Sequence, residues 1–136
     1  MSSYLEDQLL NWIKGTTFVA APANLYAALY TANPNDAQAS GTEVSGNAYA
    51  RVAIASSGWS AIAAAGAGTG DSITNSGVVT FPTPTGAGWG TVTGFALYDA
   101  ASVGNEIVWA ALTASKVINA GDTVTFAIGA IAIFFD

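Results

Sequence analysis

Apolar and polar positions along the chain follow a helical period up to Gly15 and a strand period after it. Ser3 and Glu6 have the spacing of a capping box, and Lys14 and Gly15 are typical of a helix end. Between them, four apolar residues at spacings of four, three and one form a single stripe: Leu5, Leu9, Trp12 and Ile13. Residues 1–15 therefore predict one short helix, which either packs on its own domain or docks as an arm on a neighbouring subunit.

Residues 24–31 (NLYAALYT) have a clear strand pattern. Their side chains alternate, so that Leu25 and Leu29 face one way while Tyr26 and Tyr30 face the other. Both sets are apolar or aromatic, which predicts a strand covered on both of its faces.

The segment that follows alternates between loop and strand composition. Residues 31–47 contain the Pro, Asn, Asp, Ser and Gly of a long loop, and residues 48–55 resume as a strand. Residues 56–77 are rich in Gly, Ala and Ser. We expect this segment to be an ordered loop, because Trp59 and Ile62 need burial.

The last third of the chain predicts an antiparallel meander. Residues 91–100 and 105–114 read as two strands around a turn. A second turn at 119–122 (NAGD) leads into a final strand at 123–136, whose second half is apolar on both faces. We expect this half, which includes Phe135, to be covered on both sides, either inside a sandwich or at an intersubunit contact.

These elements define a fold class. A chain of 136 residues fits a single domain. About seven strands and one terminal helix are most simply arranged as an antiparallel β-sandwich. The sequence therefore predicts a mainly β protein with one domain over residues 1–136, jelly-roll-like or immunoglobulin-like, in which residues 1–15 form an N-terminal helical arm.

Charge and hydropathy exclude several classes of function. Charged side chains make up 9% of the chain, against about 25% in an average soluble domain, so much of the surface must be neutral or covered. A net charge of -6 disfavours binding to nucleic acid. The apolar stretch at 126–135 is too short to span a membrane as a helix, and the acidic, amphipathic N-terminal segment does not match a signal peptide. We expect no nucleic-acid partner, no membrane and synthesis in the cytoplasm.

Candidate catalytic and ligand-binding residues give weak signals. The chain has no histidine or cysteine, which removes the usual general bases and thiolate chemistry. Most of its carboxylates lie in turns, where they cap backbone amides, although a glycosidase needs only two of them. Seven carboxylates are candidates for such a pair: Asp36, Glu43, Asp71, Asp99, Glu106, Asp122 and Asp136. We expect no enzyme, no cofactor and no metal site.

Three short motifs have structural explanations as good as their chemical ones. Residues 66–71 (GAGTGD) lack the lysine of a phosphate-binding loop, and residues 33–36 (NPND) lack the spacing of a calcium-binding loop. Lys116, Asn119 and Asp122 have the residue types of an isopeptide site, but neighbours at a turn normally solvate their charges.

Aromatic side chains leave carbohydrate binding open. Five aromatic residues are candidates for a surface that stacks on sugar rings: Tyr49, Trp59, Trp89, Tyr98 and Trp109. Trp109 sits within a strand and favours core packing. Trp89, within GAGWG, is the most plausible exposed aromatic, and it either packs inside the domain or forms part of a partner surface.

Several segments together resemble a family of small virion proteins of tailed bacteriophages, often labelled tail fibre proteins, with relatives that decorate or cement capsids. The resemblance covers most of the chain but little of residues 55–76, and its most specific parts are TEVSGxxYAR and LTxSKxIxxGDT. The matching segments are YLEDQLLNWI followed by Gly15 and Thr16, LYAALYTANPNDA, GTEVSGNAYAR, WGTVTGFALYDAASVGN and ALTASKVINAGDTVTFAIGAIAI. It implies a non-enzymatic structural protein present in several copies on the virion.

This resemblance leaves head and tail open. The sequence has no collagen-like repeat or long heptad run of a fibre shaft, which favours a capsid cement or decoration protein over a tail fibre component. The expected partners are then the major capsid protein and copies of the chain itself, arranged as a trimer at a threefold axis, on the capsid surface rather than the tail. A carbohydrate receptor is expected only for a tail location.

Arg51 is the only arginine, eight residues after Glu43. Its five donors suit a latch that fixes the 41–48 loop through Glu43, or a bridge to a carboxylate of a neighbouring subunit. The candidate partner-contact residues are Leu5, Leu9, Trp12, Glu43, Arg51, Trp89 and Phe135.

Overall fold

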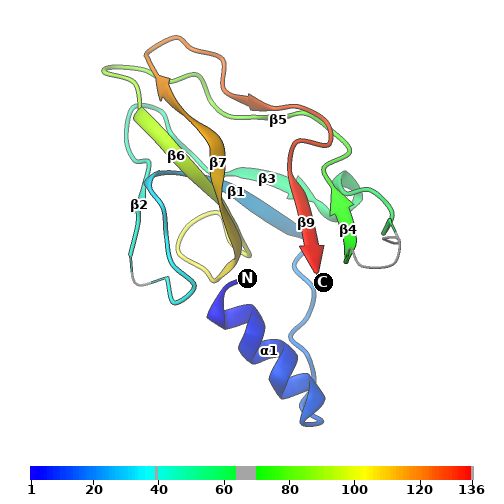
Figure 1. Cartoon of the computed structure of the whole chain (residues 1–136). Helices are drawn as coiled ribbons and strands as arrows, with labels where there is room; N and C mark the ends of the chain where they lie inside the picture. The colour runs from blue at the N-terminus through cyan, green and yellow to red at the C-terminus, as the bar shows by residue number, and fades with distance from the viewer. Residues whose placement is uncertain (39, 64–69, 136) are drawn as a thin grey trace.

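The structure, a computed structural model, describes residues 1–38, 40–63 and 70–135 and is mainly β (Figure 1). The paired strands are all antiparallel, and the only α-helix in these ranges is at the N-terminus. This confirms the predicted fold class. The elements are α1 (Ser3–Ile13), β1 (Asn24–Ala32), β2 (Thr42–Glu43), β3 (Val52–Ala55), a 3-10 turn η1 (Ser56–Gly58), β4 (Asp71–Thr74), β5 (Val79–Thr80), β6 (Gly90–Tyr98), β7 (Glu106–Ile118), β8 (Thr125–Phe126) and β9 (Ala132–Phe135). No helix in the described ranges is long and apolar enough to cross a membrane.

The main sheet has five strands. Its order is β2-β1-β6-β7, and β3 also pairs with β1. Leu29 of β1 lies opposite Phe95 of β6, and Leu97 of β6 lies opposite Val108 of β7. The predicted hairpin of residues 91–114 is therefore confirmed as β6 and β7.

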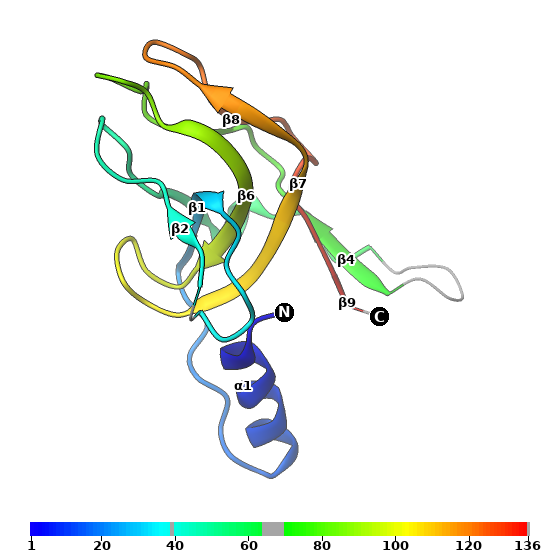
Figure 2. The same cartoon turned by 60° about the vertical axis from the view of Figure 1, so that its left-hand side comes forward.

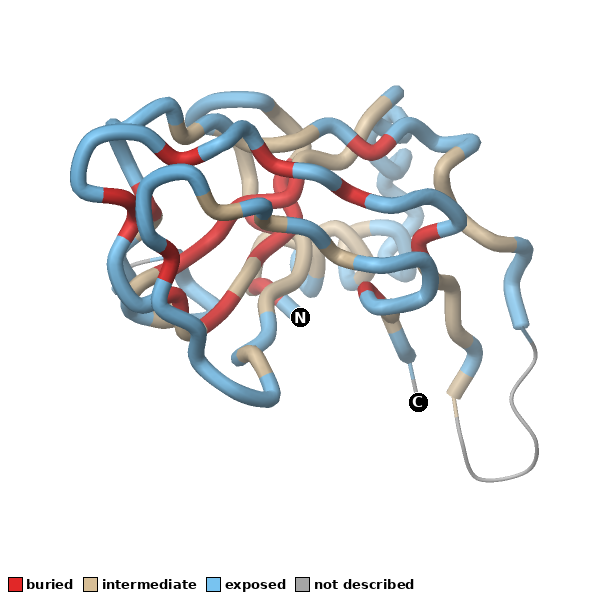
Figure 3. Tube along the Cα trace, turned by 90° about the horizontal axis from the view of Figure 1, so that it is seen from above, coloured by how far each residue is buried: buried red, intermediate tan, exposed pale blue. Residues whose placement is uncertain are grey.

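Strand β1 is covered on both faces, as its alternation predicts. Ala27 and Leu29 belong to the larger core cluster, and Leu25 packs against it. Ala28 and Tyr30 belong to a second cluster on the opposite face. The buried segments gather on the inner strands while the connections around them are exposed (Figure 3).

The larger core lies between the main sheet and two short ribbons. These ribbons are the pairs β4–β9 and β5–β8. Val79, Phe81 and Ile131 from this second layer are at most 5% exposed and belong to the same cluster as Leu29 and Leu97. The layers give the sandwich arrangement expected for sheets with one apolar face each.

The predicted final strand at 123–136 is wrong, because the chain breaks between β8 and β9. Asn75 is fully buried, and its side chain donates to the Ala127 carbonyl at 2.8 Å and accepts from the Ile131 amide at 2.8 Å. Gly129, with φ of +76°, lets the chain turn around this side chain. As a result β8 pairs with β5 and β9 with β4, so the meander ends at β7.

The expected burial differs at two residues. Phe135 is 50% exposed, because β9 lies in the two-stranded ribbon rather than inside the sandwich, so for this residue the intersubunit alternative stays a prediction. The expected burial of Ile62 is wrong, since this residue is 72% exposed, whereas Trp59 is partly buried against the main core.

The N-terminal helix projects from one end of the β body (Figures 1 and 2). None of its side chains is buried. Its N-cap is Ser2 rather than the predicted Ser3: Ser2 is fully buried, and its Oγ accepts from the Leu5 amide at 3.3 Å. The helix ends as predicted, with Gly15 in the left-handed region at φ of +87°.

Candidate interaction surfaces

Arg51 forms a latch inside the domain. Its Nε donates to Oε1 of Glu43 at 2.8 Å, and Nη2 donates to Oε2 at 2.7 Å, which is the bidentate geometry that a guanidinium favours. Nη1 donates to the carbonyl oxygens of Ala100 at 3.1 Å and Val103 at 2.8 Å. These bonds join the 41–48 loop to the β6–β7 turn, so the intramolecular alternative is confirmed.

The latch also lies on an aromatic ring. The guanidinium carbon of Arg51 is 3.6 Å from the ring centroid of Tyr98, a cation–π geometry. Although burial alone lowers the pKa of Arg51, the hydrogen bonds and charge of Glu43 raise it above its ordinary value. The Arg51 side chain is 8% exposed, and four of its donor interactions are made within the chain. Sequence spacing predicts the pair with Glu43 but not the contacts with the distant turn.

A buried polar chain continues behind the latch. Tyr98 Oη donates to Oε2 of Glu106 at 3.3 Å, and Tyr30 Oη lies 2.5 Å from Tyr98 Oη. Glu106 is fully buried, and its Oε1 has no hydrogen-bond partner among the described residues. Burial raises the pKa of the Glu106 carboxyl above its ordinary value, as it does for the phenols of Tyr30 and Tyr98.

Trp89 is part of the core, so of its two predicted alternatives the structure shows packing inside the domain rather than an exposed partner surface. Its side chain is 6% exposed, its ring lies edge-on to Tyr49 at 5.3 Å between centroids, and its Nε1 donates to the Asn47 carbonyl at 3.1 Å. Gly88, with φ of +75°, brings the backbone so close to Ile118 that a Cβ at this glycine would clash with the Ile118 carbonyl. The glycines around Trp89 therefore indicate a tight turn that directs the indole inward.

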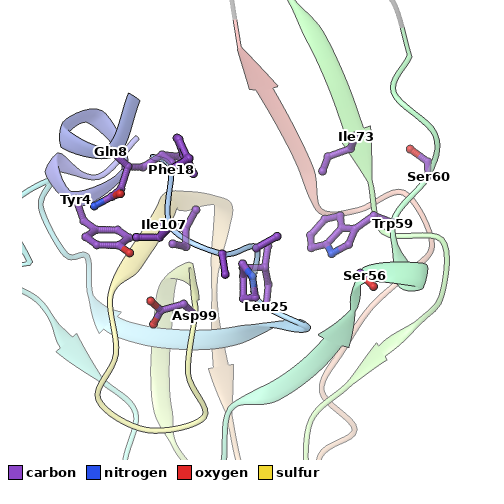
Figure 4. A pocket seen from close by; sticks show the side chains of 15 residues that line it. Tyr4, Gln8, Phe18, Leu25, Ser56, Trp59, Ser60, Ile73, Asp99 and Ile107 are labelled. Atoms are coloured by element: carbon purple, nitrogen blue, oxygen red, sulfur yellow. The ribbon is translucent and has the colours of Figure 1, made fainter. Parts of the chain in front are cut away.

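An apolar groove lies at the base of α1 (Figure 4). The groove has a volume of about 610 Å³. Tyr4 and Gln8 of α1 lie on one side of it and Trp59 lies on the other, with Leu25 between them. Leu5 of α1 and Phe18 also line the groove. Beyond the groove the predicted stripe is uncovered, since Trp12 is 61% and Ile13 is 72% exposed. Leu5 and Leu9 are half-buried.

A second, smaller groove runs between β7 and β9. Its volume is about 380 Å³, and its lining includes Val108 and Trp109 of β7 and Phe134 and Phe135 of β9. Phe135 is therefore a surface residue, as a partner-contact candidate must be, but it lines a different surface from Leu5.

The candidate carboxylates mostly serve the fold. Asp99 accepts from the Asn105 amide and side chain at 2.7 and 2.8 Å, and Asp122 accepts from the Asn119 amide at 2.7 Å. Asp36 accepts from Trp109 Nε1 at 2.9 Å. Over residues 1–38, 40–63 and 70–135 there is no group of three acidic residues that could hold a metal. Residues 66–69 of the glycine-rich motif, and Asp136, lie outside these ranges.

The candidate residues thus divide into three groups. Glu43, Arg51 and Trp89 hold the domain together from within. Leu5, Leu9 and Trp12 share one surface on α1, and Phe135 lies on another. The sequence pattern did not identify Phe18 or Tyr4 as parts of the α1 surface. Tyr4 lies one helical turn before Gln8, and this spacing places the two side chains on the same side of the helix.

The fold and these surfaces describe a small antiparallel β domain whose loops are held by internal charged groups and whose α1 exposes apolar side chains. The chain belongs to the family described as podophage GP4 fiber I protein gp80, whose model matches residues 1–133. The resemblance seen in the sequence is confirmed, and the chain is a structural protein of the phage virion. No curated protein matches it.

Proposed function

We propose that the chain is a non-enzymatic fibre component of the phage tail. The observation that carries the proposal is the family match over nearly the whole chain, to a family described as a fiber protein. It is supported by the way the domain uses its charges. Arg51, Glu43, Asp99 and Asp122 are engaged in internal hydrogen bonds that stabilise loops.

Attachment to other virion subunits follows from the exposed apolar surface. Exposure of Trp12 and Ile13 on α1 is unfavourable unless a neighbouring subunit covers them, because large apolar patches are a solubility hazard on an isolated domain. In this proposal α1 and its groove form the attachment side, and the domain is present in several copies.

Capsid cement is the second candidate. The domain has one short helix and no fibre shaft among its described elements, which suits a protein that sits on a lattice and contacts the major capsid protein. A receptor-binding role toward carbohydrate has less support, because Tyr49, Trp89 and Tyr98 are used in the core and only Trp59 of the five candidate aromatics lines the α1 groove.

Cryo-electron microscopy of intact virions tests the proposal. We expect density that fits the β body within a tail fibre or its attachment site. Density spread over the capsid lattice would establish the cement function in its place. Absence of the chain from purified virions by mass spectrometry would contradict both functions.

A further inference from the structure

The apolar stripe of α1 is covered at its base and bare at its tip. Leu5 lines the groove at the base, and Leu9 is half-buried one turn further on. The far end of α1 extends beyond the body (Figure 2). Trp12 and Ile13 continue the same stripe toward that end, and each is more than half exposed. The helix α1 therefore has exposed apolar side chains at its tip and lines part of an apolar groove at its base.

Such an arrangement is self-complementary. If two copies of α1 pack antiparallel about a twofold axis near Leu9, the tip of each helix lies against the base of the other. Trp12 and Ile13 of each copy then face the groove beside Tyr4 and Leu5 of its partner. Leu5 at the base and Ile13 at the tip are eight residues apart, which is about 12 Å or roughly two turns, so both contacts form at once.

The complementary shape of tip and base favours a second copy over other apolar partners, and the stripe itself carries no charged side chain that would oppose it. At 100° per residue, Asp7 and Lys14 lie on the side of α1 opposite the stripe, and Glu6 lies at its edge beside Ile13. The charged residue that lines the groove is Asp99, and Asn105 already binds both of its carboxylate oxygens. A chain with net charge -6 repels its own copies over most of its surface, and this repulsion is weakest where the apolar stripe meets the groove.

We propose that α1 and the groove at its base form a contact between two copies of the chain, with the two helices antiparallel and Trp12 of each seated in the groove of the other. The contact goes beyond the proposed function and holds for either a tail or a capsid location. The groove volume of about 610 Å³ is within the range of sites that take large apolar groups.

Cysteine cross-linking tests the geometry, because the chain contains no cysteine of its own. Leu9→Cys lies at the proposed axis and should form a disulfide-linked dimer under mild oxidation. Leu5→Cys and Ile13→Cys should cross-link when mixed but much less when either is oxidised alone. Asp7→Cys, on the opposite side of the helix, is the matched control and should remain monomeric.

Two outcomes overturn the proposal. Efficient self-cross-linking of Ile13→Cys would show parallel helices, as in a helical trimer. Leu9→Cys dimers no more abundant than those of Asp7→Cys would show that α1 does not pair.

Sedimentation equilibrium provides an independent measurement on the unmodified chain. Trp12→Asp should weaken self-association about tenfold or more, as expected for a central aromatic contact, while circular dichroism stays unchanged because Trp12 is exposed. Asp7→Asn should leave association unchanged or slightly stronger. Equal association of the Trp12→Asp variant and the unmodified chain would contradict the proposal, as would a saccharide that binds the groove while leaving association unaffected.

Discussion

The loop-bearing end of the β body and the helical arm differ in whether their large side chains have partners within the chain. At the body end, Arg51 makes four hydrogen bonds and lies on the ring of Tyr98. On the arm, Trp12 and Ile13 have most of their surface exposed. The chain has three basic and nine acidic residues, and it uses its only arginine internally. Charged groups therefore fix the loops at the body end, whereas the arm leaves its large apolar side chains at the tip exposed.

Substitution of one tryptophan in each region should show the largest difference between the two regions. Trp89→Ala should lower the free energy of unfolding by about 3–5 kcal/mol, because it leaves a cavity among Tyr49, Phe81 and the sheet. Trp12→Ala should change it by no more than about 0.5 kcal/mol, because the side chain is exposed. Urea unfolding of both variants at low protein concentration measures the difference. Similar losses would mean that α1 packs on the body more closely than the structure shows.

Arg51→Ala is the next largest change expected. It leaves the Glu43 carboxylate without its bidentate partner and frees the 99–104 turn, and we expect a loss of about 2–4 kcal/mol in unfolding free energy. Arg51→Lys should recover part of this loss, since one ammonium cannot replace the planar fork. Lys116→Ala, at an exposed lysine of β7, is the control and should stay within about 0.5 kcal/mol. A loss no larger than that of the control would contradict the latch.

Local patterns in the sequence predicted the elements whose contacts are close along the chain. Alternation in β1 gave both of its faces, and the β6–β7 hairpin followed from two strands around one turn. The final strand failed because its break depends on Asn75, which is more than 50 residues away in sequence. A strand pattern carries no information about such a distant side chain.

The candidate site divides in the same way. Glu43 and Arg51 are eight residues apart, and their opposite charges were sufficient to predict the latch. Tyr98 and the carbonyls of Ala100 and Val103 come from the far side of the fold, so sequence reasoning missed them. The sequence left the burial of Trp89 open, because glycine-rich flanks suit an exposed turn as well as a tight one, and only packing distinguishes these cases.

Glu106 gives a pH-dependent test of the body end. Burial, and to a smaller extent the negative charge of Asp36, raises the pKa of the Glu106 carboxyl above its ordinary value of 4.5. Between 4.5 and this higher pKa the unfolded chain loses the proton first, so the contribution of Glu106 to stability falls as pH rises through that window. We expect Glu106→Gln to gain about 1–3 kcal/mol in unfolding free energy relative to the unmodified chain between pH 4 and neutral pH. A difference that stays constant with pH would mean that the carboxylate is solvated.

Ser2→Ala tests the junction where the two regions meet, with the smallest expected effect. The Ser2 hydroxyl donates to the carbonyl oxygens of Glu106 and Ile107 and caps the Leu5 amide, so it joins the start of α1 to the start of β7. Loss of this hydroxyl should lower the stability of α1 by about 1 kcal/mol, as is typical of an N-cap, while the stability of the β core stays unchanged. Hydrogen exchange followed by mass spectrometry should show faster exchange in residues 3–14 and unchanged exchange in β1 and β6. Ser3→Ala is the matched control, since the structure assigns the cap to Ser2, and it should leave exchange in the helix nearly unaltered. If Ser3→Ala instead produces the larger effect, the capping box predicted from the sequence is correct and the docking of α1 through Ser2 is not.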